Sequence, residues 1–477
     1  GFFDTKMIGD LMQRIGDHSR IEAFLTSTTL NTLFSFVSLI VFSVVLAVYS
    51  LKLFVVFLMA SLLYVAWITL FLKKRKELDY KRFAQASAEQ SNLYQLITGM
   101  QEIKLNNCER QKRWEWENIQ AKLFRVSIKG LALSQYQQSG AFFINETKNI
   151  LISFVSAAAV IRGDMTLGMM TAVQYIIGQL NAPVNQMIGF VQSAQDAKIS
   201  LERLGEIHNR KDEEEDEAGK LHTLPVAVGG GMAPLLVRGL RFRYDSYGAD
   251  ILQDIDLEIP AGKVTAVVGA SGSGKTTLVK LLLGFYPPTG GEIRVGGTPL
   301  EAVSRHLWRD RCGSVMQEGF LFSDTIARNI AVGDEEIDPE RLRFAVEVAN
   351  IREMVESLPL GFHTKIGQEG KGVSQGQRQR ILIARAVYKN PDYLFFDEAT
   401  NALDANNERV IMENLQQFFK GRTVVIVAHR LSTVRHADQI VVIEGGRIIE
   451  RGTHEELAAL QGAYYRLVKN QLELGEG

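Results

Sequence analysis

The stretch Gly269-Ala270-Ser271-Gly272-Ser273-Gly274-Lys275-Thr276-Thr277 decides the fold of this part of the chain. An apolar run, 264–268, precedes it and another, 278–283, follows it, so strand, glycine-rich turn and helix are predicted in that order. This is the phosphate-binding loop pattern GxxxxGK[ST]. Its glycines let backbone N–H groups point at phosphate oxygens, and the helix N-terminus adds positive potential. The sequence therefore predicts a nucleoside triphosphate site.

Two side chains of the loop are expected to have different roles. Lys275 is expected against the outer phosphates, and the Thr276 hydroxyl is expected as a ligand of Mg²⁺. A Gly/Ser turn with a chance lysine is the alternative, and the correct flanks disfavour it. The loop residues predicted to bind ATP are Gly269, Ser271, Gly272, Ser273, Gly274, Lys275, Thr276 and Thr277.

The composition sets outer limits on the function. Among the 477 residues, 53 basic and 54 acidic side chains nearly cancel, which gives no reason to expect nucleic acid as a partner. Cys108 and Cys312 belong to no metal-binding spacing, so both are expected to be reduced thiols. Long apolar runs are confined to the first 200 or so residues. The chain is therefore expected to have a membrane part and a water-soluble part.

Four membrane spans are predicted in the first part. Residues 30–50 and 53–72 contain no charged side chain, and each run is near the ~20 apolar residues needed to cross a bilayer. Residues 142–161 and 167–191 are weaker candidates, because polar side chains accompany them. Basic residues cluster at 73–82, after the second span, and the positive-inside rule then places the segment 73–140 and both chain ends in the cytoplasm.

The remaining organisation follows from periodicity and charge. Residues 73–140 are polar with helical spacing, which predicts two long helices with a break near 105–113. The acidic run 212–217 and the glycines 229–231 indicate a linker, 211–234. The expected fold is multidomain: an all-α transmembrane helical bundle with long cytoplasmic extensions (1–210), then an α/β domain with a helical subdomain (235–477).

Two further apolar strands end in side chains suited to a phosphate site. Residues 393–396 run into Asp397 and Glu398, where Asp397 can complete the Mg²⁺ shell and Glu398 can orient or deprotonate the attacking water. Residues 423–428 run into His429, which is predicted to contact the γ-phosphate. Alone, a histidine at a strand tip would more often be a packing residue.

The segment Ser374-Gln375-Gly376-Gln377 resembles the signature motif of ABC transporters. With Asp397-Glu398 and Asn401-Ala402-Leu403-Asp404 behind it, the spacing is similar to that of ABC exporters, and the similarity covers essentially the whole chain. The resemblance implies ATP and Mg²⁺ as cofactors. It also implies roles for further residues: Tyr244 stacks on adenine, Gln317 is a catalytic residue that senses Mg²⁺, His429 is a switch, Asp404 lies in the inter-subunit loop, and Glu369-Gly370 touches the coupling helices.

One departure from the family pattern concerns the signature itself. The family usually reads Leu-Ser-Gly-Gly-Gln, and here Val373 and Gln375 replace the first leucine and glycine. Ser374 and Gly376 are retained, so an anion-binding helix N-terminus is still expected. Gln375 could weaken the closed dimer, and this alternative stays open.

The resemblance also implies an assembly. Each ATP is expected between the phosphate loop of one subunit and the signature of the other, so a second half-transporter is required. A homodimer is the simplest partner, and a matched heterodimer is the alternative. Coupling helices are expected near 3–9 and 107–114, although both could be merely solvated amphipathic segments. In the exporter pattern two further spans precede this sequence, so a fragment is expected.

The function implied is ATP-driven export of a substrate across the bacterial inner membrane. The sequence as a whole is most similar to those of peptide and bacteriocin exporters, and lipid or drug export is the alternative. A soluble DNA-repair ATPase is excluded by the spans, a regulated channel is disfavoured by Glu398, and an importer by the fusion of the two parts. Gln174, Gly178, Asn181 and Asn185 share one helix face beside Pro183. They are expected to line the path or, equally, to hydrogen-bond between helices.

Overall fold

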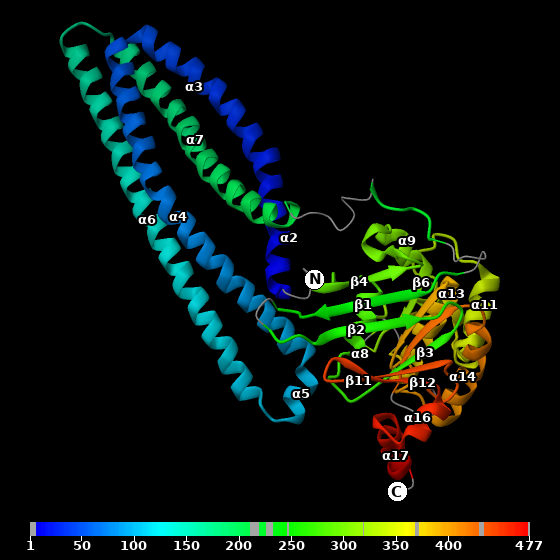
Figure 1. The fold of residues 1–477 in the computed structure, drawn as a ribbon. Coiled ribbons are helices and arrows are strands. Elements are labelled where there is room, and N and C mark those ends of the chain that lie inside the picture. Colours follow the sequence, from blue (N-terminus) through cyan, green and yellow to red (C-terminus); the bar gives the residue numbers. More distant parts are fainter. Residues whose placement is uncertain are drawn as a thin grey trace. The chain divides into compact units, whose positions relative to one another are not determined.

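The structure is a computed structural model that describes residues 6–209, 219–225, 232–245, 248–317, 319–367, 372–428 and 434–475. The chain divides into two compact units, Gly1–Lys211 and Asp212–Gly477. The first is built of long helices and the second of mixed sheets and shorter helices, which agrees with the predicted fold class (Figure 1).

The helical unit consists of rods that run up and down beside one another (Figure 1). Its elements are α2 (Ile8–Ala23), the π-helical turn η1 (Phe24–Thr28), α3 (Thr29–Tyr49), α4 (Leu51–Thr98), α5 (Met100–Leu105), α6 (Glu109–Ile161) and α7 (Leu167–His208). The predicted break near 105–113 is confirmed, because the chain leaves α5 through Asn107, whose φ is 49°, before α6 begins. Polar caps form the tight turns: the Ser50 hydroxyl accepts from the Leu53 N–H, and the Thr166 hydroxyl from the Met169 N–H.

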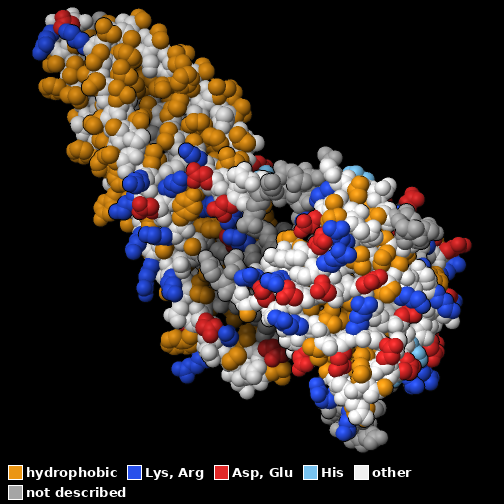
Figure 2. All heavy atoms as spheres, in the orientation of Figure 1, with side chains coloured by type: hydrophobic (Ala, Val, Ile, Leu, Met, Phe, Trp, Pro, Cys, Tyr) orange, Lys and Arg blue, Asp and Glu red, His pale blue; other side chains and the backbone are white. Residues whose placement is uncertain are grey.

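Three helices within the described residues are long and apolar enough to cross a membrane: Ile8–Tyr49, Leu51–Thr98 and Glu109–Ile161. They contain the predicted spans 30–50, 53–72 and 142–161. The fourth predicted span, 167–191, lies within α7, which is helical throughout but is not among the three, so this span stays a prediction. Figure 2 shows hydrophobic side chains covering one half of the helical unit up to a small charged tip, while Lys, Arg, Asp and Glu gather along the other half. This division suits a bundle that is partly embedded in lipid.

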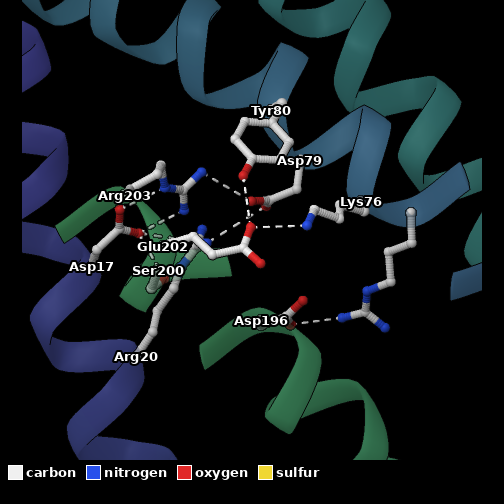
Figure 3. A network of polar contacts seen from close by, with 10 residues as sticks. Asp17, Arg20, Lys76, Asp79, Tyr80, Asp196, Ser200, Glu202 and Arg203 are labelled. Atoms are coloured by element: carbon white, nitrogen blue, oxygen red, sulfur yellow. Dashed lines mark hydrogen bonds and ion pairs between the residues drawn. The ribbon is translucent and has the colours of Figure 1, made fainter. Parts of the chain in front are cut away.

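A group of charged side chains joins α2, α4 and α7 at the charged end of the helical unit (Figure 3). At its centre, Asp17 and Arg203 are each 3 % exposed. Arg203 donates to both Asp17 carboxylate oxygens at 2.7 Å and to Asp79 Oδ2 at 3.1 Å. Ser200 Oγ donates to Asp17 Oδ1 at 2.9 Å, and Arg20 pairs with Asp79 at 3.5 Å. We call these five residues the ionic cluster.

The ionic cluster is closed by its own members. The Arg203 guanidinium also lies 4.4 Å from the centre of the Phe83 ring, which covers a face that could otherwise take water. Buried charges are tolerated when they are paired in this bidentate way. The cluster therefore fixes how three helices far apart in sequence pack together.

The described residues of the second unit form three sheets. Its strands are β1 (Leu235–Phe242), β2 (Leu252–Ile259), β3 (Val264–Val268), β4 (Gly290–Val295), β5 (Thr298–Pro299), β6 (Cys312–Val315), β7 (Asp324–Thr325), β8 (Lys365–Ile366), β9 (Tyr393–Asp397), β10 (Thr423–Val427), β11 (Gln439–Glu444) and β12 (Arg447–Gly452). The main sheet has the order β12-β11-β3-β10-β9-β6, with parallel neighbours from β11 to β6. An antiparallel sheet has the order β2-β1-β4-β5, and β7 pairs with β8.

Helices complete the second unit. They are α8 (Lys275–Leu282), α9 (Arg305–Arg311), α10 (Ile326–Ile330), α11 (Pro339–Val348), α12 (Arg352–Glu356), α13 (Gln375–Lys389), α14 (Ala405–Phe419), α16 (His454–Leu460) and α17 (Ala463–Gly475), with 3₁₀ turns η3 (Leu300–Ala302) and η4 (Gly361–His363). Alternate residues of the main strands enter opposite cores: Phe395 packs with α8 and the antiparallel sheet, whereas Leu394 and Phe396 pack with α10 to α14. The main sheet is thus buried on both faces, as parallel sheets require.

Candidate nucleotide-binding site

The order of the main sheet brings the predicted site residues to one edge. Strands β3, β10, β9 and β6 are consecutive and parallel, so their carboxyl ends point the same way. The phosphate-binding loop follows β3, Asp397 ends β9 with Glu398 directly after it, and Gln317 lies two residues beyond β6. In open α/β sheets, ligands bind outside the carboxyl ends of the strands. The topology therefore assembles residues that are more than 100 positions apart.

Glycine is required in the loop after β3. Gly269 has a φ of 155°, and a Cβ there would lie 2.1 Å from the carbonyl oxygen of Ile443. Gly274 has a φ of 102°, and its Cβ would lie 2.6 Å from a methyl group of Leu252. Both positions exclude larger residues by backbone conformation and by space. The loop then enters α8 at Lys275, which confirms the predicted strand-turn-helix order.

Lys275 carries the positive charge of the loop and is 5 % exposed. Its ammonium donates to the carbonyl oxygens of Gly269 and Ala270, each at 2.9 Å, so the charge is held against the loop backbone. Burial lowers the pKa of Lys275, and the Glu398 and Asp397 carboxylates oppose this effect. An anion beside the loop would favour the charged ammonium in the same way.

Two buried oxygen atoms at the site have no hydrogen-bond partner among the residues that the structure describes. Thr276 Oγ1 donates to Asp397 Oδ1 at 3.1 Å, but Asp397 Oδ2 and Ser273 Oγ accept or donate no hydrogen bond within the described part of the chain. Asp397 is fully buried, and burial raises the pKa of its carboxyl group. Buried polar atoms are nearly always paired in folded proteins, so atoms left open at a strand end point to a missing ligand.

The oxygens at this point suit Mg²⁺. The Thr276 hydroxyl and the open Asp397 oxygen are hard donors at the same place, and Mg²⁺ is usually held by one or two such groups together with phosphates and water. The described residues include no cluster of three or more His, Cys, Asp or Glu side chains that could hold an ion by themselves. Gln317, also predicted as a Mg²⁺ ligand, donates its side-chain amide to Glu398 Oε2 at 3.0 Å.

Glu398 is the second carboxylate of the site, and its side chain is oriented by two amides. Asn401 Nδ2 donates to Glu398 Oε2 at 2.8 Å, and Gln317 donates to the same oxygen. The backbone of Glu398 has a φ of 52°, in the left-handed region, where a residue with a side chain needs support from its surroundings. Glu398 is thus held by contacts from β10, α13 and its own turn.

Gln379 belongs to this support, although no sequence motif marked it as a site residue. Its side chain is 7 % exposed, and its amide donates to the carbonyl oxygen of Glu398 at 3.0 Å. A signal was available: Gln379 occupies the same helix face as Leu382, Ile383 and Ala386, all of which are buried. A glutamine at a core position of an amphipathic helix needs a polar partner inside the protein.

The predicted signature segment begins α13. Ser374 is the N-cap: its hydroxyl accepts from the Gln377 N–H at 3.2 Å, and the Gln377 side chain accepts from the Ser374 N–H at 2.9 Å. Gln375 and Gly376 form the first turn, so the expected helix N-terminus is present despite the altered motif. Asp404 similarly caps α14, accepting from the Asn407 N–H at 3.0 Å. Contacts of either segment with a second subunit stay predictions.

Ser271 and Gly272 lie in the turn between β3 and α8, and Tyr244 is the predicted ATP ligand outside this loop. Its ring is 48 % exposed and packs edge-on against Phe242 and Tyr286, and its hydroxyl lies 3.4 Å from Thr277 Oγ1. An exposed aromatic face next to the loop is compatible with adenine stacking. Other predictions lie outside the described residues: His429, Glu369-Gly370, the acidic run 212–217 and the first part of the coupling segment near 3–9.

The polar stripe of α7 makes hydrogen bonds between helices. Gln174 Nε2 donates to Ser153 Oγ on α6 at 2.8 Å. Lys148, 4 % exposed, donates to Asn181 Oδ1 at 2.7 Å, and the Tyr64 hydroxyl on α4 donates to Asn185 Oδ1 at 2.8 Å. Of the two predicted roles, interhelical hydrogen bonding is therefore the one that these contacts favour.

Two family models match the chain. Residues 1–184 match the ABC transporter transmembrane region, and residues 252–401 match the ABC transporter family. The second match contains the loop after β3, the signature segment and Glu398. Together the matches reach most of both units.

Similar proteins include a toxin RTX-I translocation ATP-binding protein from Actinobacillus pleuropneumoniae, 37 % identical over 475 residues, and the leukotoxin translocation ATP-binding protein LktB from Mannheimia haemolytica, 36 % identical. Each alignment covers 99 % of this chain and 66 % of the relative, so the chain spans just under two thirds of their length. A solved structure of a bacterial Atm1-family ABC exporter with ATP bound is 25 % identical, with a TM-score of 0.88 over 98 % of this chain and 81 % of that one.

Proposed function

Because this chain belongs to the ABC transporter family, we propose that it is one half of an ATP-driven exporter in the bacterial inner membrane. The observation that carries the proposal is the open, buried oxygen of Asp397 beside Thr276, with Lys275 and the oriented Glu398 at the same sheet edge. These are the groups that bind a triphosphate and position water for phosphoryl transfer. The apolar helices of the first unit supply the membrane part.

In the proposed reaction each residue has a separate task. The N–H groups of the loop and the Lys275 ammonium hold the β- and γ-phosphates, and Tyr244 stacks on adenine. Thr276 and Asp397 would hold Mg²⁺, which would offset the phosphate charge when bound. Glu398, kept in place by Gln317 and Asn401, orients the attacking water and accepts its proton. His429 contacts the γ-phosphate in this proposal.

The proposed assembly is a dimer of two such chains. Ser374, Gln375, Gly376 and Gln377 begin α13 and would meet the ATP bound by the partner, with Asp404 in the loop between the subunits. Nucleotide-bound closure of the two ATPase units would reorient the membrane helices, and hydrolysis would reset them. A homodimer is the simplest arrangement, because this chain carries both the loop and the signature.

We propose a peptide or protein as the exported substrate. The relatives named for toxin RTX-I and leukotoxin translocation support this class over lipids or drugs. The test is ATP hydrolysis by the chain in proteoliposomes supplied with unfolded casein, with a cationic dye or with added phospholipid. Stimulation by casein alone supports the proposal, whereas stimulation by the dye or the lipid alone would favour the alternative substrates.

The catalytic part is tested with Glu398→Gln. In lipid nanodiscs with Mg·ATP, this variant should hydrolyse ATP about 10²- to 10⁴-fold more slowly than the wild type, because the proton acceptor is lost. Binding of ATP should remain. The matched control is Glu356→Gln, which alters an exposed carboxylate paired with Arg352 and should leave the rate unchanged. A Glu398→Gln variant with the wild-type rate would refute the role of Glu398.

A further inference from the structure

The turn that carries Glu398 is bridged by a single buried side chain. Gln379 Nε2 donates to the carbonyl oxygen of Glu398 at 3.0 Å, at the start of the turn. Gln379 Oε1 accepts from the Ala402 N–H at 3.3 Å, at its end. One partner is an acceptor and the other a donor, so only one orientation of the amide satisfies both. Gln379 therefore clamps both ends of the turn 398–402.

The turn needs such a clamp. Glu398 adopts a left-handed backbone conformation, which a residue with a Cβ keeps only when neighbouring contacts determine it. The Glu398 N–H is fixed by the carbonyl oxygen of Val427 at 3.1 Å, and its carbonyl accepts from the Asn401 N–H at 3.3 Å and from Gln379. Of these contacts, only the bond from Gln379 comes from α13. The direction in which the Glu398 carboxylate points depends on this backbone.

Gln379 lies on the helix that begins with the signature. It is one helical turn beyond Gln375, and the first turn of α13 packs on the same loop, since a Cβ on Gly376 would lie 3.0 Å from the carbonyl oxygen of Ala402. Gln379 also lines a cavity of about 550 Å³ together with Gln317 and Gln375. A shift of the start of α13 would thus reach the Glu398 backbone through two contacts.

We infer that Gln379 is a positioning residue, which couples the placement of the signature helix to the orientation of Glu398. The inference deepens the proposed function and rests on it. Gln379 contacts neither phosphate nor water in this account. It sets the backbone from which the Glu398 carboxylate reaches the water, so its loss should slow hydrolysis while ATP binding persists.

The experiment compares Gln379→Met with the matched control Gln439→Met in the full chain in nanodiscs. Gln439 is also 7 % exposed, and its amide donates to the backbone carbonyl of Glu258 at 3.1 Å, away from the site. For Gln379→Met, kcat for ATP should fall about tenfold or more, with KM and the melting temperature close to those of the control. A merely structural role would instead lower the melting temperature beyond the control and leave kcat unchanged, which would overturn the inference.

A second variant tests the hydrogen bond itself. Gln379→Glu keeps the shape, but its carboxylate cannot donate to the Glu398 carbonyl until it is protonated. The rate of this variant relative to the wild type should therefore rise as the pH falls, whereas the relative rate of Gln379→Met should stay flat. A flat ratio for both variants would overturn the inference.

The two proposals fail in different ways. If the wild type does not hydrolyse ATP, or if Glu398→Gln is as active as the wild type, the proposed function fails. If the wild type is active, Glu398→Gln is inactive and Gln379→Met turns over like the Gln439→Met control, only the role of Gln379 fails.

Discussion

The ionic cluster and the nucleotide site are both buried and polar, yet they differ in how their atoms are satisfied. Both Asp17 oxygens accept hydrogen bonds from Arg203, and the Arg203 guanidinium has partners on two helices. Asp397 is equally buried, but one of its oxygens has no partner in the described structure. The first group is complete without a ligand, and the second is not.

The comparison separates two uses of buried charge. A closed group of charges specifies which helices meet, and breaking one member leaves an unpaired charge inside the protein. An open group costs stability in the absence of a ligand, and proteins carry such costs mainly at functional sites. Mutations should therefore have opposite consequences: loss of a partner destabilises the ionic cluster, whereas removal of the open charge stabilises the nucleotide site.

Arg203→Met should have the largest effect on stability of the variants proposed here, because it removes a partner from the ionic cluster. It leaves Asp17 buried with the Ser200 hydroxyl and, at 3.8 Å, the Arg20 guanidinium as partners, so the free energy of unfolding should fall by about 3 kcal/mol. Thermal unfolding of the full chain in detergent micelles measures this loss. The matched control is Lys76→Met, because Lys76 and Glu202 form a pair in which both side chains are 40 % exposed. Its loss should leave the melting temperature close to that of the wild type, because solvent screens an exposed pair.

Equal melting temperatures for Arg203→Met and Lys76→Met would show that the ionic cluster does not hold the helices together. The ionic cluster would then have no structural role, and it would no longer differ from the nucleotide site in what its buried charges do.

Asn181→Leu tests a second buried polar contact within the helical unit, the hydrogen bond from Lys148. The variant removes one of the two amide oxygens that accept from buried Lys148, and Asn145 remains as the other. Interhelical hydrogen bonds of this kind contribute about 1–2 kcal/mol at most, so the melting temperature in micelles should fall modestly. Asn185→Leu is the comparison variant and should cost less, because Asn185 is exposed and bonds neutral Tyr64.

The same variants separate the two roles predicted for the stripe. If the stripe holds helices together, stability falls in Asn181→Leu and any loss of transport follows the loss of folded protein. An unchanged melting temperature with impaired transport and retained ATP hydrolysis would instead assign the stripe to the translocation path.

Local motifs were predictable because their geometry is set by neighbouring residues. The loop Gly269–Thr277 needs glycine at Gly269 and Gly274, and this spacing is visible in the sequence. The membrane spans 30–50 and 53–72 were likewise predictable, because the length of each charge-free run can be read directly from the sequence. The start of α13 was predictable for the same reason, since Ser374 and Gln377 form a capping box within four residues.

Long-range pairings were not predictable. Asp17 and Arg203 are 186 positions apart, and nothing in either segment marks its partner. The two hydrogen bonds of Gln379 were missed for the same reason. Its partners, Glu398 and Ala402, lie in the turn that follows β9, whereas Gln379 lies on α13. The left-handed backbone of Glu398 also has no local signal, since no glycine stands there. The two possible roles of the stripe could be separated only when Ser153, Lys148 and Tyr64 were placed opposite it.

The smallest expected effect on stability concerns Asp397, whose open buried oxygen we infer is kept for a ligand. Burial raises the pKa of Asp397 above its value in the unfolded chain, about 3.9, so ionising it inside the protein costs stability as the pH rises past that value. Asp397→Asn should therefore gain about 1 kcal/mol at neutral pH, and the gain should shrink as the pH falls toward about 4. Asp438→Asn serves as the control, because it loses an exposed pair with Lys263 while its amide oxygen can still accept from the Val264 N–H.

The most direct measurement is thermal unfolding of the wild type and Asp397→Asn in nanodiscs at neutral pH, each with and without Mg·ATP. We expect Asp397→Asn to melt higher than the wild type without ligand and to gain much less from Mg·ATP. A variant that melts lower without ligand and keeps the full wild-type gain from Mg·ATP would contradict this expectation.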